Sequence, residues 1–122
     1  MRITLELEGG NRIRAYRHGE LTVNQTRYTA STIVMPEEIL ADWPPPDLDA
    51  LRAEHLAVLY ERELEVVVLG TGPRLRFPSP AVTAGLLARG VGVEVMDTPA
   101  ACRTYNILMG DGRRVAAALL LG

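Results

Sequence analysis

The first third of the chain alternates apolar and polar residues in the manner of β-strands. In residues 3–8 every second side chain is apolar, which is the period of a half-buried strand, and the glycines that come next allow a tight reversal. Further extended runs cover residues 13–16 and 21–23, and a longer β-branched strand is predicted over residues 26–35, where a proline stops it. Short strands joined by turns predict an antiparallel meander.

The strand pattern gives way to a proline-rich segment at Trp43-Pro44-Pro45-Pro46. Three prolines exclude a helix interior or a central strand, so this segment is predicted to be a stiff extended connection. Such a segment can be the ligand of a recognition module, but a rigid loop packed over the core is the interpretation we favour. Asp47 then follows as a predicted helix N-cap, and leucines at positions 48, 51, 56 and 59 form a stripe at helical spacing.

From Leu64 onward the pattern becomes strand, helix, strand, helix, strand. The apolar runs at residues 64–69, 91–96 and 114–121 predict the three strands, and the first is typical of a strand covered on both faces. Ser79-Pro80 and Thr98-Pro99 each combine a helix N-cap with proline at the first helical position, which predicts the two helices.

These elements predict the α/β class. With 122 residues there is room for one core, so we expect a compact three-layer single domain over residues 1–122. We expect a central mixed sheet with an N-terminal antiparallel β meander and a C-terminal βαβαβ unit.

The amino-acid composition excludes several kinds of binding site and catalytic chemistry. The formal net charge of -2 gives no strong field for nucleic acid, and a single cysteine excludes an internal disulfide and a multi-cysteine zinc site. The absence of lysine removes Schiff-base chemistry and the lysine of a P-loop. We therefore expect no cofactor, no metal and no nucleic-acid partner. The N-terminus lacks the apolar region of a signal peptide, and the longest apolar stretch, residues 115–121, is too short to span a membrane, so we expect a cytoplasmic protein without membrane insertion.

Two strand-to-helix turns, at Gly70–Gly72 and Asp97–Ala101, are the best candidate for a ligand site. In open α/β sheets, ligands bind outside the carboxyl ends of the strands, where helix N-termini offer free amides. An anion is the predicted ligand, and the candidate residues are Gly70, Thr71, Gly72, Arg74, Thr98, Arg103 and Asn106. The dinucleotide fingerprint is incomplete, because Leu75 stands where its third glycine belongs. The alternative, glycines that only let the chain reverse, therefore carries more weight.

The helix predicted after Thr98 places Cys102, Tyr105 and Asn106 near one face. A thiol near a helix N-terminus and beside Arg103 would have a lowered pKa if it were exposed, but a buried structural cysteine is the commoner outcome. We expect Asn106 to hold a loop through backbone hydrogen bonds rather than to act in catalysis.

Four segments in this order resemble one family: residues 66–72, 92–98, 101–108 and 113–118. The chain is similar over nearly its whole length to the domain of unknown function 498 family, the group that includes the mitochondrial complex I assembly factor three and adipogenesis-associated homologues. The resemblance implies a three-layer α/β fold, no established catalytic activity or cofactor, and members that act through other proteins.

Two hypotheses remain. The first is a non-enzymatic protein-interaction or assembly factor, for a respiratory complex by analogy, with Trp43, Tyr105 and Arg74 as candidate contact residues; its protein partners are unidentified and a weak homo-oligomer is left open. The second is a small-ligand or anion-binding protein, or a minor enzyme, that uses the two strand-to-helix turns. The sequence leaves open whether the chain is an enzyme, and it favours a protein without catalytic activity.

Overall fold

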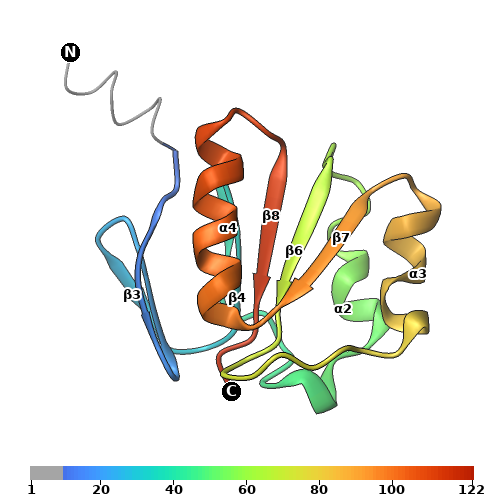
Figure 1. The fold of residues 1–122 in the computed structure, drawn as a ribbon, viewed down its shortest axis with the longest axis horizontal. Helices are drawn as coiled ribbons and strands as arrows, with labels where there is room; N and C mark the ends of the chain where they lie inside the picture. Colours follow the sequence, from blue (N-terminus) through green and yellow to red (C-terminus); the bar gives the residue numbers. More distant parts are fainter. Residues whose placement is uncertain (1–9) are drawn as a thin grey trace.

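The computed structural model describes residues 10–122 and arranges them as two β-sheets with helices between and beside them (Figure 1). The strand predicted over residues 3–8 lies outside the described residues. The first strand of the described chain begins at Ile13, and the last ends at Leu119.

The smaller sheet confirms the predicted meander. It contains β1 (Ile13–Arg17), β2 (Glu20–Val23) and β3 (Thr26–Tyr28), paired antiparallel in chain order. Asn24 has a φ of 54° in the turn between β2 and β3, a left-handed conformation that asparagine tolerates. The register between β1 and β2 shifts between Ile13 and Ala15, so Arg14 sits at a β-bulge.

The larger sheet is the predicted central mixed sheet. Its strand order is β5-β4-β8-β6-β7, with β6 parallel to both β7 and β8, and β4 antiparallel to both β8 and β5. Helix α3 joins β6 to β7 and helix α4 joins β7 to β8, which confirms the C-terminal βαβαβ unit. The bounds of these elements are β4 (Thr32–Met35), β5 (Glu38–Leu40), β6 (Val66–Gly70), α3 (Pro80–Ala88), β7 (Gly92–Met96), α4 (Thr98–Gly110) and β8 (Val115–Leu119).

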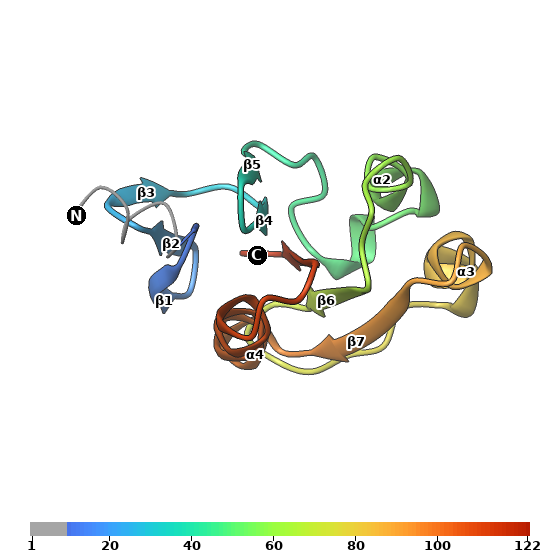
Figure 2. The same cartoon turned by 90° about the horizontal axis from the view of Figure 1, so that it is seen from above.

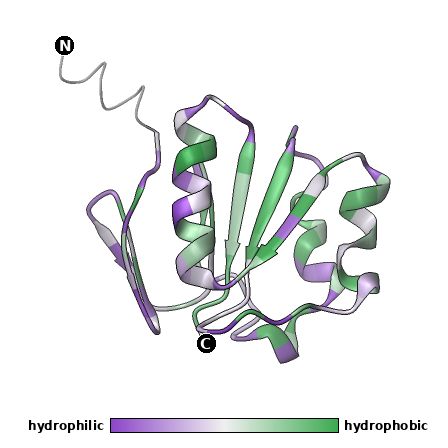
Figure 3. Cartoon of the chain, viewed as in Figure 1, coloured by the Kyte–Doolittle hydropathy of each residue, from purple (hydrophilic) through white to green (hydrophobic). Residues whose placement is uncertain are grey.

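The central strands are buried on both faces, which produces three layers. Every residue of β6 and β8 is buried, and Figure 3 shows these strands as the apolar centre of the molecule. Alternate side chains of each strand enter two different cores. One core lies under α4 and the meander, and the other lies under α3 and the short helices of residues 48–57. Helix α4 and helix α2 (Ala53–Ala57) are therefore on opposite sides of the sheet (Figure 2).

The prediction of one strand over residues 26–35 is wrong. The chain forms β3 at the edge of the small sheet, leaves it at Thr29 and Ala30, and enters the large sheet as β4. All four residues of β4 are buried, because the strand pairs with β8 and contributes side chains to both cores. Long-range pairing thus divides a stretch in which only Ala30 and Ser31 are weak strand formers.

The leucine stripe that comes after the prolines forms two short helices instead of one. A 3₁₀ turn, η1 (Leu48–Ala50), begins at Asp47, whose carboxylate accepts the Ala50 N–H at 3.1 Å as predicted for an N-cap. The chain is extended at Leu51 and Arg52 before α2 (Ala53–Ala57) begins. All four leucines are nevertheless buried in the core under α2 and α3.

Candidate functional site

The carboxyl ends of β6 and β7 are joined by the side chain of Thr98. Its hydroxyl accepts the Gly72 N–H at 2.8 Å and donates to the Leu120 carbonyl at 2.8 Å, and its own N–H donates to the Gly72 carbonyl at 2.8 Å. Thr98 is completely buried. This threonine therefore fastens the turn after β6, the start of α4 and the segment after β8 to one another.

Several backbone amides at which an anion was predicted to bind already donate hydrogen bonds within the chain. The Thr71 N–H donates to the Met96 carbonyl at 2.9 Å, and the Ala100 N–H donates to the Asp97 carboxylate at 2.9 Å. A Cβ atom on Gly70 would lie 2.9 Å from the Thr98 hydroxyl, so this glycine is needed for close packing. These amides of the two turns are thus already paired within the chain, and the geometry favours the alternative in which the glycines serve the chain reversal.

The residue that caps α4 differs from the prediction. Asp97, one residue before Thr98, is the N-cap, and Pro99 lies at the second helical position. Thr98 was expected to cap the helix because threonine before proline is a common helix start. Its side chain is instead directed into the interior, where its hydroxyl bonds to Gly72 and Leu120.

The other predicted ligand residues lie in different environments. Arg74 is exposed on the loop that comes after β6, and Arg103 is exposed on α4. The Asn106 carboxamide accepts the Ile13 N–H at 2.9 Å and donates to the Ile13 carbonyl at 2.8 Å. Asn106 therefore holds β1 against α4, in agreement with the expectation that it fixes backbone rather than acts in catalysis.

Trp43 and Tyr105 are buried. Trp43 is 5% exposed and donates from Nε1 to the His55 carbonyl at 2.9 Å. Tyr105 has no exposed surface, and its hydroxyl donates to the Asn11 carbonyl at 2.7 Å, next to the contact made by Asn106. Burial raises the pKa of the Tyr105 hydroxyl. Both side chains support the interior of this fold, and a partner cannot reach either of them in this conformation.

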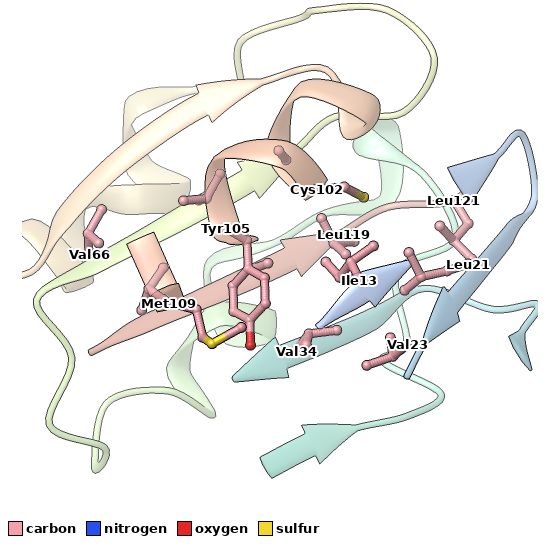
Figure 4. Close-up of a cluster of buried hydrophobic side chains, with 14 residues drawn as sticks. Ile13, Leu21, Val23, Val34, Val66, Cys102, Tyr105, Met109, Leu119 and Leu121 are labelled. Carbon is pink, nitrogen blue, oxygen red and sulfur yellow. The ribbon is translucent and has the colours of Figure 1, made fainter. Parts of the chain in front are cut away.

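Cys102 lies in the core under α4 and the meander (Figure 4). Burial raises the pKa of its thiol to about 12, and this outweighs the lowering by Arg103. The expected structural role of this cysteine thus fits its environment. A thiol that stays protonated and buried is a poor nucleophile.

We expect Cys102 to resist alkylation in the folded protein. Treatment with iodoacetamide at about pH 8 should leave the mass unchanged until denaturant is added, because the thiolate is the reactive form. Intact-protein mass spectrometry measures this directly. A Leu75→Cys variant is the matched control, since position 75 is exposed and should be alkylated at once. Rapid modification of Cys102 itself in native buffer would contradict the burial.

Sequence reasoning missed an exposed apolar pair on the loop between β6 and α3. Leu75 is 50% exposed and Phe77 is 72% exposed, and they alternate with Arg74 and Arg76. The Thr71 hydroxyl holds this loop by donating to the Arg74 carbonyl at 2.7 Å and accepting the Arg76 N–H at 3.2 Å. The alternation of arginine and large apolar residues just after a glycine turn was the signal that could have identified this surface, which we call the Arg74–Phe77 loop.

Comparisons with known proteins agree with the fold. The chain is 36% identical over 117 residues to "NADH dehydrogenase [ubiquinone] 1 alpha subcomplex assembly factor 3" of Danio rerio, an alignment that covers 94% of this chain and 67% of that protein. A crystal structure from Bordetella parapertussis is 43% identical, with a TM-score of 0.86 over 93% of this chain and 98% of that one. The structure of "an outer membrane protein" from Bartonella henselae is 28% identical, with a TM-score of 0.80 over 93% of this chain and 97% of that one.

The fold defines a three-layer α/β protein in which a small antiparallel sheet is docked on one helix of a mixed sheet. Residues 13–120 match the family described as "Protein of unknown function (DUF498/DUF598)", and the chain belongs to that family. The predicted resemblance is thereby confirmed. None of the helices in residues 10–122 combines the length and the apolar character that a membrane span requires.

Proposed function

We propose that this protein is a non-enzymatic assembly factor that acts by binding another protein, and that its target is a subunit of a respiratory complex. The relatives named as assembly factors of NADH dehydrogenase support the class of function. This chain spans about two thirds or less of the length of those relatives, so their role is carried over here only as part of the proposal.

The observation that carries the proposal is the Arg74–Phe77 loop. A large aromatic side chain that is 72% exposed, beside a half-exposed leucine, is costly to leave in water. Aromatic and arginine side chains are enriched among the residues that dominate protein interfaces. Because Thr71 fixes the loop backbone, little conformational entropy is lost when a partner covers it.

The chemistry of the loop specifies the partner surface. Phe77 and Leu75 require an apolar pocket, and Arg74, which forms no ion pair within residues 10–122, requires a carboxylate at its rim. Arg76 is held by Asp49 at 2.6 Å and therefore stiffens the loop.

The test is affinity purification of the tagged protein from its native cells, with quantitative mass spectrometry. We expect respiratory-complex subunits to be recovered with the wild type and lost with the double variant Leu75→Ser and Phe77→Ser. Leu87→Ser, at a position that is 55% exposed on α3, is the matched control and should behave as wild type. A deletion strain that kept normal amounts and activity of every respiratory complex would contradict the proposal, and so would equal recovery by the loop variant.

A further inference from the structure

A groove lies between β1 and the first turns of α4, and Pro99 of the Asp97–Ala101 turn is part of its wall. Its volume is about 290 Å³, and it is lined by Arg14, Tyr16, Pro99, Cys102, Arg103 and Asn106, among others. Asn106 is committed to the backbone of Ile13, and Cys102 is buried in the core. The two arginines are exposed to a ligand, and the Tyr16 ring lines the groove while its hydroxyl oxygen is buried.

Three arginines on this side of the molecule form no ion pair with any residue of the described part of the chain. Arg14 and Arg103 are exposed at the groove, and Arg12 stands just before β1. Within residues 10–122, none of these three side chains forms an ion pair, whereas Arg17 and Arg27 on the same sheet share Glu20. Two unpaired guanidinium groups on opposite walls of one groove attract an anion that can accept hydrogen bonds from both.

Arg14 owes its place to an irregularity of the sheet. It sits at the β-bulge between Ile13 and Ala15, while the backbone of Ile13 is fixed by Asn106. Bulges alter the direction of side chains along a strand and are common beside binding sites. In the wall of the groove that β1 forms, the backbone is therefore fixed at Ile13 and departs from regular strand geometry at Arg14.

Tyr16 supplies a second, independent observation. Its hydroxyl oxygen is the one buried side-chain polar atom, among the described residues, that lacks a hydrogen-bond partner. Burial, the Cys102 thiol and the Asp97 carboxylate all raise the pKa of this hydroxyl, so it remains a donor at neutral pH. Asp97 itself is occupied as the N-cap of α4. A buried donor with no acceptor is unfavourable, and an anion that reaches this hydroxyl from the groove and accepts its hydrogen bond would relieve that cost.

We infer that the groove between β1 and α4 binds a small organic anion, either a phosphate monoester or a carboxylate, whose charged group lies between Arg14 and Arg103 and whose body packs on Pro99 and the Tyr16 ring. The site is separate from the Arg74–Phe77 loop. The ligand and the protein partner therefore bind different surfaces. Substitutions can abolish either binding activity without affecting the other.

The test is a titration of the ¹⁵N-labelled protein monitored by NMR, with inorganic phosphate, phenyl phosphate and benzoate as probes. Saturable shifts of the amide signals of residues 14–16 and 102–103 are expected, with phenyl phosphate or benzoate tighter than inorganic phosphate because each adds a ring for the groove. Comparison of phenyl phosphate with benzoate distinguishes phosphate from carboxylate ligands. Arg14→Gln and Arg103→Gln should each weaken binding by about tenfold.

Two further variants test whether the anion occupies this groove rather than another basic surface. Tyr16→Phe should weaken binding while leaving the stability of the free protein unchanged or raised, because its hydroxyl forms no hydrogen bond that the fold would lose. Arg74→Gln is the matched control and should bind the probes as wild type does, even if it abolishes partner recovery. Shifts that do not saturate, or that persist unchanged in Arg14→Gln and Arg103→Gln, would overturn the inference and leave the proposed function intact.

Discussion

Thr98→Val is expected to cause the largest loss of stability of any single isosteric change in the described chain. Valine keeps the shape of threonine but can neither accept the Gly72 N–H nor donate to the Leu120 carbonyl. Both backbone groups would be left unpaired around a side chain with no exposed surface. Each unsatisfied buried group costs about 1–3 kcal/mol, so we expect the free energy of unfolding to fall by about 2–5 kcal/mol.

Chemical denaturation monitored by circular dichroism measures this difference. Thr98→Ser is the matched control, since it keeps the hydroxyl and loses only a methyl group, and its cost should be about 1 kcal/mol. Thr83→Val offers a second control, because the Thr83 hydroxyl is on the outside of α3 and makes only a 3.5 Å contact with Pro80. If Thr98→Val and Thr98→Ser were equally stable, the hydroxyl would not hold the three segments together.

The role of Thr98 also shows why the candidate site was only partly predictable. The sequence places Gly72 and Thr98 after consecutive parallel strands, so their proximity is a consequence of topology. The third partner, the carbonyl of Leu120, lies after β8 and returns to the same point only because β8 inserts between β4 and β6. Local patterns do not encode that insertion, and without it the same residues look like free ligands for an anion.

Among the strands, too, some features follow from the local sequence and others only from long-range pairing. The continuous apolar run of β6 predicted burial on both faces, because such a run is typical of a strand that is covered on both sides. No local breaker marks the division of residues 26–35, and pairing of β4 with β8, far along the chain, decides it. The exposure of Phe77 likewise depends on what the rest of the fold leaves uncovered.

Asn106→Ala is the second change for which we expect a large effect, and it should loosen the meander selectively. The Asn106 side chain pairs with both backbone groups of Ile13, as a neighbouring strand would, and the adjacent Tyr105 hydroxyl binds the Asn11 carbonyl. Alanine removes two hydrogen bonds at a partly buried position, which is worth about 1–3 kcal/mol. Because the large sheet has its own core under α3, the loss should be concentrated in the small sheet.

Hydrogen exchange read by mass spectrometry distinguishes local from global loosening. Peptides from β1 and β2 should exchange faster in Asn106→Ala, while peptides from β6 and β8 should keep their protection. Ile107→Ala is the matched control on the same helix, since that side chain is 65% exposed and should change neither region. Uniformly faster exchange across both sheets would show that the two sheets unfold as one cooperative unit, and that Asn106 contributes to the whole domain rather than to the docking of β1 on α4.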